Sequence, residues 1–119
     1  MREEFKSMAG LAHVQRRDPA NQLIAALFTL AGGHGALLRH DERAWASITF
    51  AGMRHTLAFR FLGDDGVAAG EAFVAALPEQ EFAIPKRLVA DATVVAVRHS
   101  LLPEPSLVVE CELLVLDED

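Results

Sequence analysis

The strongest constraint on the fold of this chain is the regular alternation of apolar and polar residues between positions 44 and 61. In the second half of this stretch, one strand face carries Met53, His55, Leu57, Phe59 and Phe61. Such a period of two is typical of a strand with one buried face. Residues 44–50 and 53–61 therefore predict an antiparallel hairpin that turns at Ala51 and Gly52.

Further strands are predicted on both sides of this hairpin. Residues 88–99 and 107–116 are rich in β-branched side chains and predict a closing pair of strands. The loop 101–106 between them contains prolines, which a central strand would exclude. Before the hairpin, residues 36–40 predict a short strand that turns at 41–43.

The first predicted helix has clear start and stop signals. Asp18 and Pro19 are the expected N-cap and first helical residue, and the glycine pair 32–33 is expected to end the helix. Two adjacent apolar stripes run along residues 21–31. So wide an apolar face belongs against a core or a partner.

A second helix is predicted after a loop at residues 63–66, with Asp64 or Asp65 as its N-cap and Pro78 as its end. The order α-β-β-β-α-β-β predicts an α+β fold, a two-layer sandwich in which helices cover one face of an antiparallel sheet of four to five strands. We expect residues 1–119 to form a single domain, with 1–17 as a short helix or frayed N-terminal arm.

Composition restricts the partners and the compartment. The chain is 51 % hydrophobic with a mean hydropathy of +0.20, yet no apolar run reaches the 18 residues of a spanning helix. Acidic residues near the N-terminus argue against a signal peptide, so we expect a cytoplasmic protein without membrane contact. A net charge of −6 argues against nucleic acid as a partner. Arginine outnumbers lysine nine to two, which favours a GC-rich bacterial source.

Two polar residues interrupt apolar strand faces and are the first candidates for chemistry. His55 alternates with Leu57 and Phe59, and Asp91 alternates with valines in the stretch 88–99. Each could be a hydrogen-bonded core residue. Each could instead be a catalytic residue, with the pKa of the histidine tuned by burial.

The remaining candidates are weaker. His34 in the Gly-rich turn and Trp45 near a strand start are candidate ligand-binding residues. Cys111 is in phase with buried positions and is expected to be inert, while Glu110 and Glu112 face the other way and could pair with arginines across the sheet. The histidines show no HxxxH, HExxH or HxH spacing, so the sequence predicts neither a metal site nor a cofactor.

The favoured interpretation is a small, non-catalytic α+β interaction module that self-associates as a homodimer, through the helix at 21–31 or an exposed sheet face. The alternative is a small-molecule-binding protein or an enzyme with a pocket between helix and sheet, which uses His55 and Asp91 as an acid–base pair. The loop 101–106 is a candidate contact for another protein.

Overall fold

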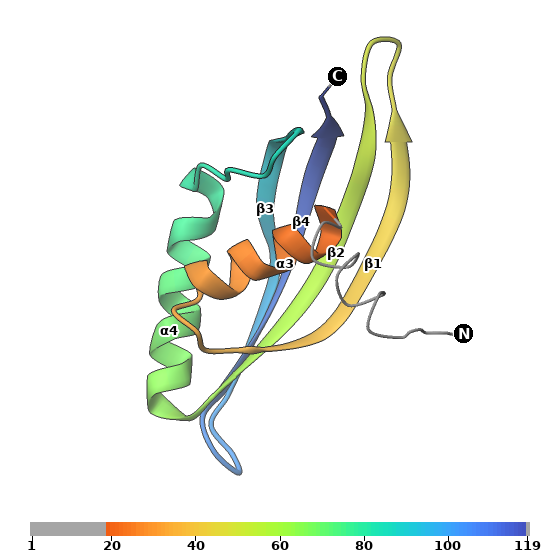
Figure 1. The fold of residues 1–119 in the computed structure, drawn as a ribbon. Helices are drawn as coiled ribbons and strands as arrows, with labels where there is room; N and C mark the ends of the chain where they lie inside the picture. Colours follow the sequence, from red (N-terminus) through yellow and green to blue (C-terminus); the bar gives the residue numbers. More distant parts are fainter. Residues whose placement is uncertain (1–18, 119) are drawn as a thin grey trace, which may run out of the picture.

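Four antiparallel strands form one twisted sheet, and two helices cover one of its faces (Figure 1). The structure is a computed structural model that describes residues 19–118. Its elements, in chain order, are α3 (Pro19–Leu30), β1 (Ala36–Ala46), β2 (Ala51–Leu62), α4 (Gly63–Ala76), the 3-10 turn η1 (Leu77–Glu79), β3 (Arg87–Ser100) and β4 (Ser106–Asp117). The predicted α+β class is confirmed, with the order α-β-β-α-β-β and one strand fewer than the order we predicted.

The sheet has the strand order β1-β2-β4-β3. Two hairpins, β1–β2 and β3–β4, are therefore joined through the β2–β4 pairing, which runs from Gly52 opposite Leu116 to Leu62 opposite Ser106. Strands β1 and β3 form the two edges. The β1–β2 connection and the β3–β4 connection lie at opposite ends of the molecule (Figure 1).

The first hairpin turns at a different place from the predicted one. Ala51 and Gly52 belong to β2, and the turn is formed by residues 47–50 instead. There the Ser47 N–H donates to the Phe50 carbonyl oxygen at 2.7 Å, and the Phe50 N–H donates to Ser47 Oγ at 3.1 Å. The predicted turn at 41–43 is also wrong, because β1 passes straight through these charged residues.

The hydrophobic core lies between the helices and the covered face of the sheet. Phe59 is at its centre, with its ring centroid 5.5 Å from that of Phe28 on α3 and 5.6 Å from that of Phe73 on α4. On α3, Leu23 and Leu27 are fully buried, and the second apolar stripe packs partly buried against the same core. Both stripes of this helix therefore serve the chain's own core.

Glycine residues mark the end of α3 and the start of α4. Gly32 and Gly33 have positive φ angles and end α3, as predicted. The loop predicted at 63–66 is absent, because α4 starts directly at Gly63, where β2 ends. The N-cap of α4 is Leu62, so the prediction of Asp64 or Asp65 was wrong, and both aspartates lie in the first turn of the helix. The predicted N-cap of α3, Asp18, lies outside the described residues.

Strand β3 contains two irregularities that change its alternation. The register shifts between Val89 and Asp91, and again between Val94 and Ala96. Each shift adds one residue to β3 relative to β4, which is the effect of a β-bulge. Residues on opposite sides of a bulge therefore do not keep the phase that a strict period of two predicts.

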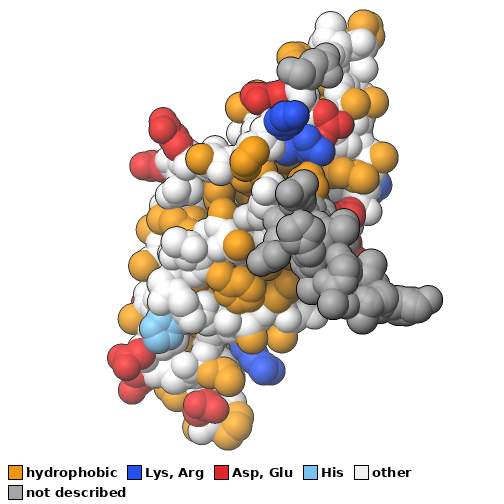
Figure 2. All heavy atoms as spheres, viewed as in Figure 1, with side chains coloured by type: hydrophobic (Ala, Val, Ile, Leu, Met, Phe, Trp, Pro, Cys, Tyr) orange, Lys and Arg blue, Asp and Glu red, His pale blue; other side chains and the backbone are white. Residues whose placement is uncertain are grey.

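Several large apolar side chains remain exposed at the two ends of the sheet. Ile48 and Phe50 project from the β1–β2 turn, and Leu101 and Leu102 from the β3–β4 loop. On the helical face, hydrophobic side chains are visible between and beside the helices, and basic side chains lie next to acidic ones near the upper end of the sheet (Figure 2).

Candidate metal centre

Three polar side chains meet on the covered face of the first hairpin. His40 and Glu42 are two residues apart on β1 and therefore point to the same side of the sheet. His55 lies on β2 directly opposite Glu42, while His40 is opposite Leu57. We call His40, Glu42 and His55 the His–Glu–His cluster.

The donor atoms of this cluster are close enough to share one ion. His40 Nε2 and His55 Nδ1 are 2.9 Å apart, and Glu42 Oε2 lies 3.7 Å from each of them. In a triangle of these dimensions a single point lies about 2.0 Å from all three atoms, which is the Zn–N and Zn–O distance of protein sites. The three ligand atoms are thus close enough to share one ion, and the two rings, whose centroids are 5.2 Å apart, would have to turn for both nitrogen lone pairs to point at it.

The cluster spans the boundary between core and solvent. His55 is 4 % exposed, whereas the side chain of His40 is 18 % and that of Glu42 is 40 % exposed. Without an ion, one of the two facing imidazole nitrogens must carry a proton and the other must accept it. With an ion, both nitrogens would present lone pairs to it.

A bulge in β1 determines which side chains join the cluster. The register shifts between Leu37 and Arg39, so that Leu37 and His40 both face the core although they are three residues apart. Beyond the bulge, Arg39 and Asp41 point to the open face, where they form an ion pair at 3.1 Å.

The structure does not bring His55 and Asp91 together. His55 pairs with Leu113 of β4, whereas Asp91 pairs with the next residue, Leu114, so the two side chains lie on opposite faces of the sheet. On the open face, the Thr93 hydroxyl donates to the Asp91 carboxylate at 3.4 Å. The bulge after Val89 explains why Asp91 is on the open face. The extra residue in β3 shifts the alternation, so that Asp91 no longer shares the covered face with Val89.

The two predicted ligand-binding residues lie away from the cluster. His34 is exposed in the turn that follows α3. Trp45 pairs with Gly52, which is three residues before His55 on β2. Because side chains alternate along a strand, Trp45 faces the side of the sheet opposite to His55. Neither contributes to the His–Glu–His cluster.

The predicted burial of Cys111 and the predicted ion pairs of Glu110 and Glu112 on β4 agree with the structure. Cys111 is fully buried, and burial together with the Glu110 carboxylate raises the pKa of its thiol to about 12. Such a thiol stays protonated and is a poor nucleophile. On the open face, Glu112 pairs with Arg54 at 3.9 Å and Glu110 pairs with Arg39 at 2.6 Å, so both glutamates pair with arginines across the sheet.

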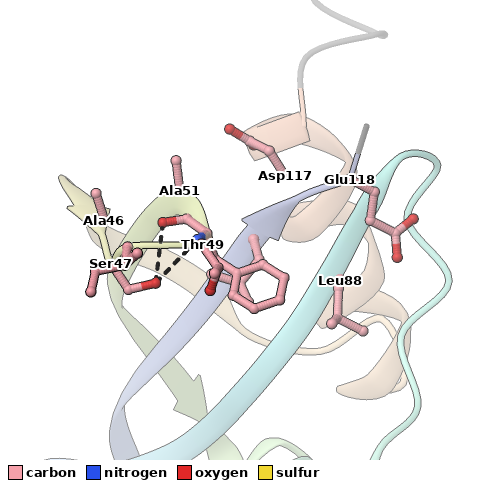
Figure 3. Close-up of a pocket in the computed structure, with 10 residues that line it drawn as sticks. Ala46, Ser47, Thr49, Ala51, Leu88, Asp117 and Glu118 are labelled. Atoms are coloured by element: carbon pink, nitrogen blue, oxygen red, sulfur yellow. Dashed lines mark hydrogen bonds between the residues drawn. The ribbon is translucent and has the colours of Figure 1, made fainter.

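Besides a pocket lined by residues around Thr56 and Glu112, two further pockets adjoin the β1–β2 hairpin. The first, of about 280 Å³, includes Glu42 and His55 in its wall and is called the histidine pocket. The second, of about 580 Å³, is called the hairpin-tip pocket. It is bounded by the turn and strand ends 46–51 on one side and by Leu88, Leu116, Asp117 and Glu118 on the other (Figure 3).

Comparison with protein-family models, with curated protein sequences and with solved structures finds no match to this chain. None of the helices within residues 19–118 has the length and apolar character required to span a membrane. The function must therefore be inferred from the site itself.

Proposed function

We propose that this protein binds a divalent transition-metal ion through His40 Nε2, His55 Nδ1 and Glu42 Oε2. The observation that carries the proposal is that these three ligand atoms lie within 3.7 Å of one another, so that one ion can reach all of them at metal–ligand distance. Imidazole nitrogen favours zinc, copper, iron and nickel among the common metals, and a carboxylate oxygen is compatible with several of them. Three protein ligands would leave at least one coordination position for another molecule.

This proposal departs from the sequence-based expectation of no metal. That expectation rested on ligand spacings within one continuous segment, whereas these ligands come from two paired strands. A plain hydrogen-bonded polar cluster has the same residues but requires no ion. The two interpretations differ in whether the purified chain takes up metal with one-to-one stoichiometry.

The test is isothermal titration calorimetry of chelator-treated protein with Zn²⁺ at neutral pH. We expect one ion per chain, and affinity reduced at least about tenfold in His40→Asn and Glu42→Gln, since loss even of outer-shell partners costs this much. His34→Asn and His99→Asn are matched controls, because both histidines are exposed and outside the cluster. Absence of binding, or equal losses in the controls, would refute the proposal.

A second proposal concerns self-association through the hairpin-tip pocket. Ile48 is fully exposed there, and Phe50 and Leu88 are about half exposed beside the same pocket. Apolar side chains gathered at one concave surface favour a protein contact. The helix at 21–31 is a poor alternative, since both of its apolar stripes pack against the core.

Native mass spectrometry and light scattering at micromolar concentration test this proposal. We expect a dimer that Ile48→Ser combined with Phe50→Ser converts to monomer. Leu101→Ser combined with Leu102→Ser is the matched control, because these two leucines are also exposed apolar residues but lie at the other end of the sheet. A wild-type monomer, or a dimer lost only in the control, would contradict it.

A further inference from the structure

The histidine pocket places a small cavity directly beside the proposed metal ligands. Glu42 and His55 form part of its wall, so an ion held by the cluster would border the cavity. The opposite side is built from the start of α3, the end of β4 and the first residue of β3. The other residues that line it are Pro19, Ala20, Gly52, Met53, Arg87, Val115 and Asp117.

Arg87 is the cationic side chain among the residues that line this pocket. Its Nε atom is 3.1 Å from Asp117 Oδ1, and its Nη1 atom donates to the Lys86 carbonyl oxygen at 2.8 Å. These contacts hold the guanidinium in place at the pocket wall. Its Nη2 atom carries two more N–H donors, and a guanidinium matches the planar geometry of a carboxylate.

The charges around the pocket favour an anion. A divalent ion and Arg87 together supply three positive charges, while Glu42 and Asp117 supply two negative ones, so the loaded pocket carries one net positive charge. A monoanion would neutralise it. The volume of about 280 Å³ is just below the range of about 300–1,000 Å³ typical of ligand sites, which suits a very small ligand, and Met53, Val115 and Pro19 form the apolar part of the wall.

We infer that the histidine pocket binds a small monocarboxylate with a short apolar chain, whose carboxylate completes the coordination of the metal ion in a pocket whose wall also carries Arg87. This inference rests on the proposed metal site and adds the chemical class of the ligand. A carboxylate fits better than a phosphate, because the cavity is small and partly apolar and because phosphate would bring excess negative charge beside Glu42 and Asp117.

The experiment uses the full chain loaded with Co²⁺, whose visible absorption reports changes in coordination, and propionate as the probe. Wild-type protein is expected to show a saturable spectral change. The double variant Arg87→Gln, Asp117→Asn removes the guanidinium without leaving its partner carboxylate unpaired. Its propionate affinity is expected to fall about tenfold, as for loss of a hydrogen bond to a charged group, with Co²⁺ affinity nearly unchanged.

Arg98→Gln is the matched control, because Arg98 is an exposed arginine on the open face of the sheet. It should leave propionate binding unchanged. Co²⁺ uptake without a saturable response to propionate would overturn the carboxylate inference alone, as would tighter binding of inorganic phosphate or an unaffected double variant. Failure to take up Co²⁺ at all would overturn the metal site and, with it, this inference.

Discussion

His40 and His55 face each other across the first hairpin with their Nε2 and Nδ1 atoms 2.9 Å apart, although fifteen positions separate them in the chain. Two facing imidazoles can share a proton or a metal ion, but not both at the same time. Proton and metal ion therefore compete for the same two nitrogen atoms.

Zn²⁺ binding is therefore expected to weaken as the solution is acidified. A histidine nitrogen must be unprotonated to bind the ion, so protons compete with the metal and metal affinity falls as the solution becomes more acidic. Calorimetric titrations at pH 7.5 and 5.5 should show at least about a tenfold loss at the lower pH. An affinity that does not change over this range would contradict ligation by these histidines.

Phe59 is expected to be the most costly aromatic residue to truncate. It is fully buried and contacts the rings of Phe28 and Phe73, so Phe59→Ala should lower the free energy of unfolding by about 3–5 kcal/mol. Phe50→Ala, at a half-exposed ring in the hairpin turn, should cost less than about 0.5 kcal/mol. Urea denaturation measures both, and similar losses would show that the core is not centred on Phe59.

Gly52 is expected to tolerate no side chain. A Cβ atom built at this position would lie 2.1 Å from the Val115 carbonyl oxygen, which is backbone and cannot rotate away. Gly52→Ala should therefore cost about 2 kcal/mol or more, although alanine normally suits a strand better than glycine. The reverse change at the exposed neighbour, Ala51→Gly, should cost about 1 kcal/mol or less. Thermal unfolding of the two variants compares them, and an unchanged Gly52→Ala protein would contradict the close approach of β2 and β4.

Cys111 is expected to make stability fall at alkaline pH. Its thiol ionises near pH 9 in the unfolded chain, whereas burial raises the folded-state pKa to about 12. Between these values the unfolded state binds fewer protons, so the free energy of unfolding decreases as the pH rises. Denaturant titrations from pH 8 to 11 should show a steeper decline for the wild type than for Cys111→Ala. Parallel declines would argue against a buried, protonated thiol.

The regular elements could be predicted from the sequence because their signals are local. The helix stop at Gly32 and Gly33 and the ranges of β3 and β4 follow from glycine conformation and β-branched alternation, and the structure confirms them. Each depends on neighbouring residues alone. Local patterns therefore sufficed for the fold class.

The candidate site could not be predicted in the same way. The charged run 41–43 was interpreted as a turn, but these residues belong to an edge strand, where charged side chains are common. That error concealed the His-x-Glu spacing of His40 and Glu42, which on a continuous strand places both on one face. The bulge after Val89 had the opposite effect, since it removed Asp91 from the face on which alternation had placed it.

All three ligands of the His–Glu–His cluster belong to a single hairpin, between positions 40 and 55. A slip of one residue between β1 and β2 would turn His55 away from His40 and Glu42, because side chains alternate along a strand. An ion bound by the three residues would accept only the native alignment of these strands. Bound metal would therefore select the native register of β1 and β2. Because its three ligands lie within sixteen consecutive residues, this cross-link could form before the β3–β4 hairpin packs against β2.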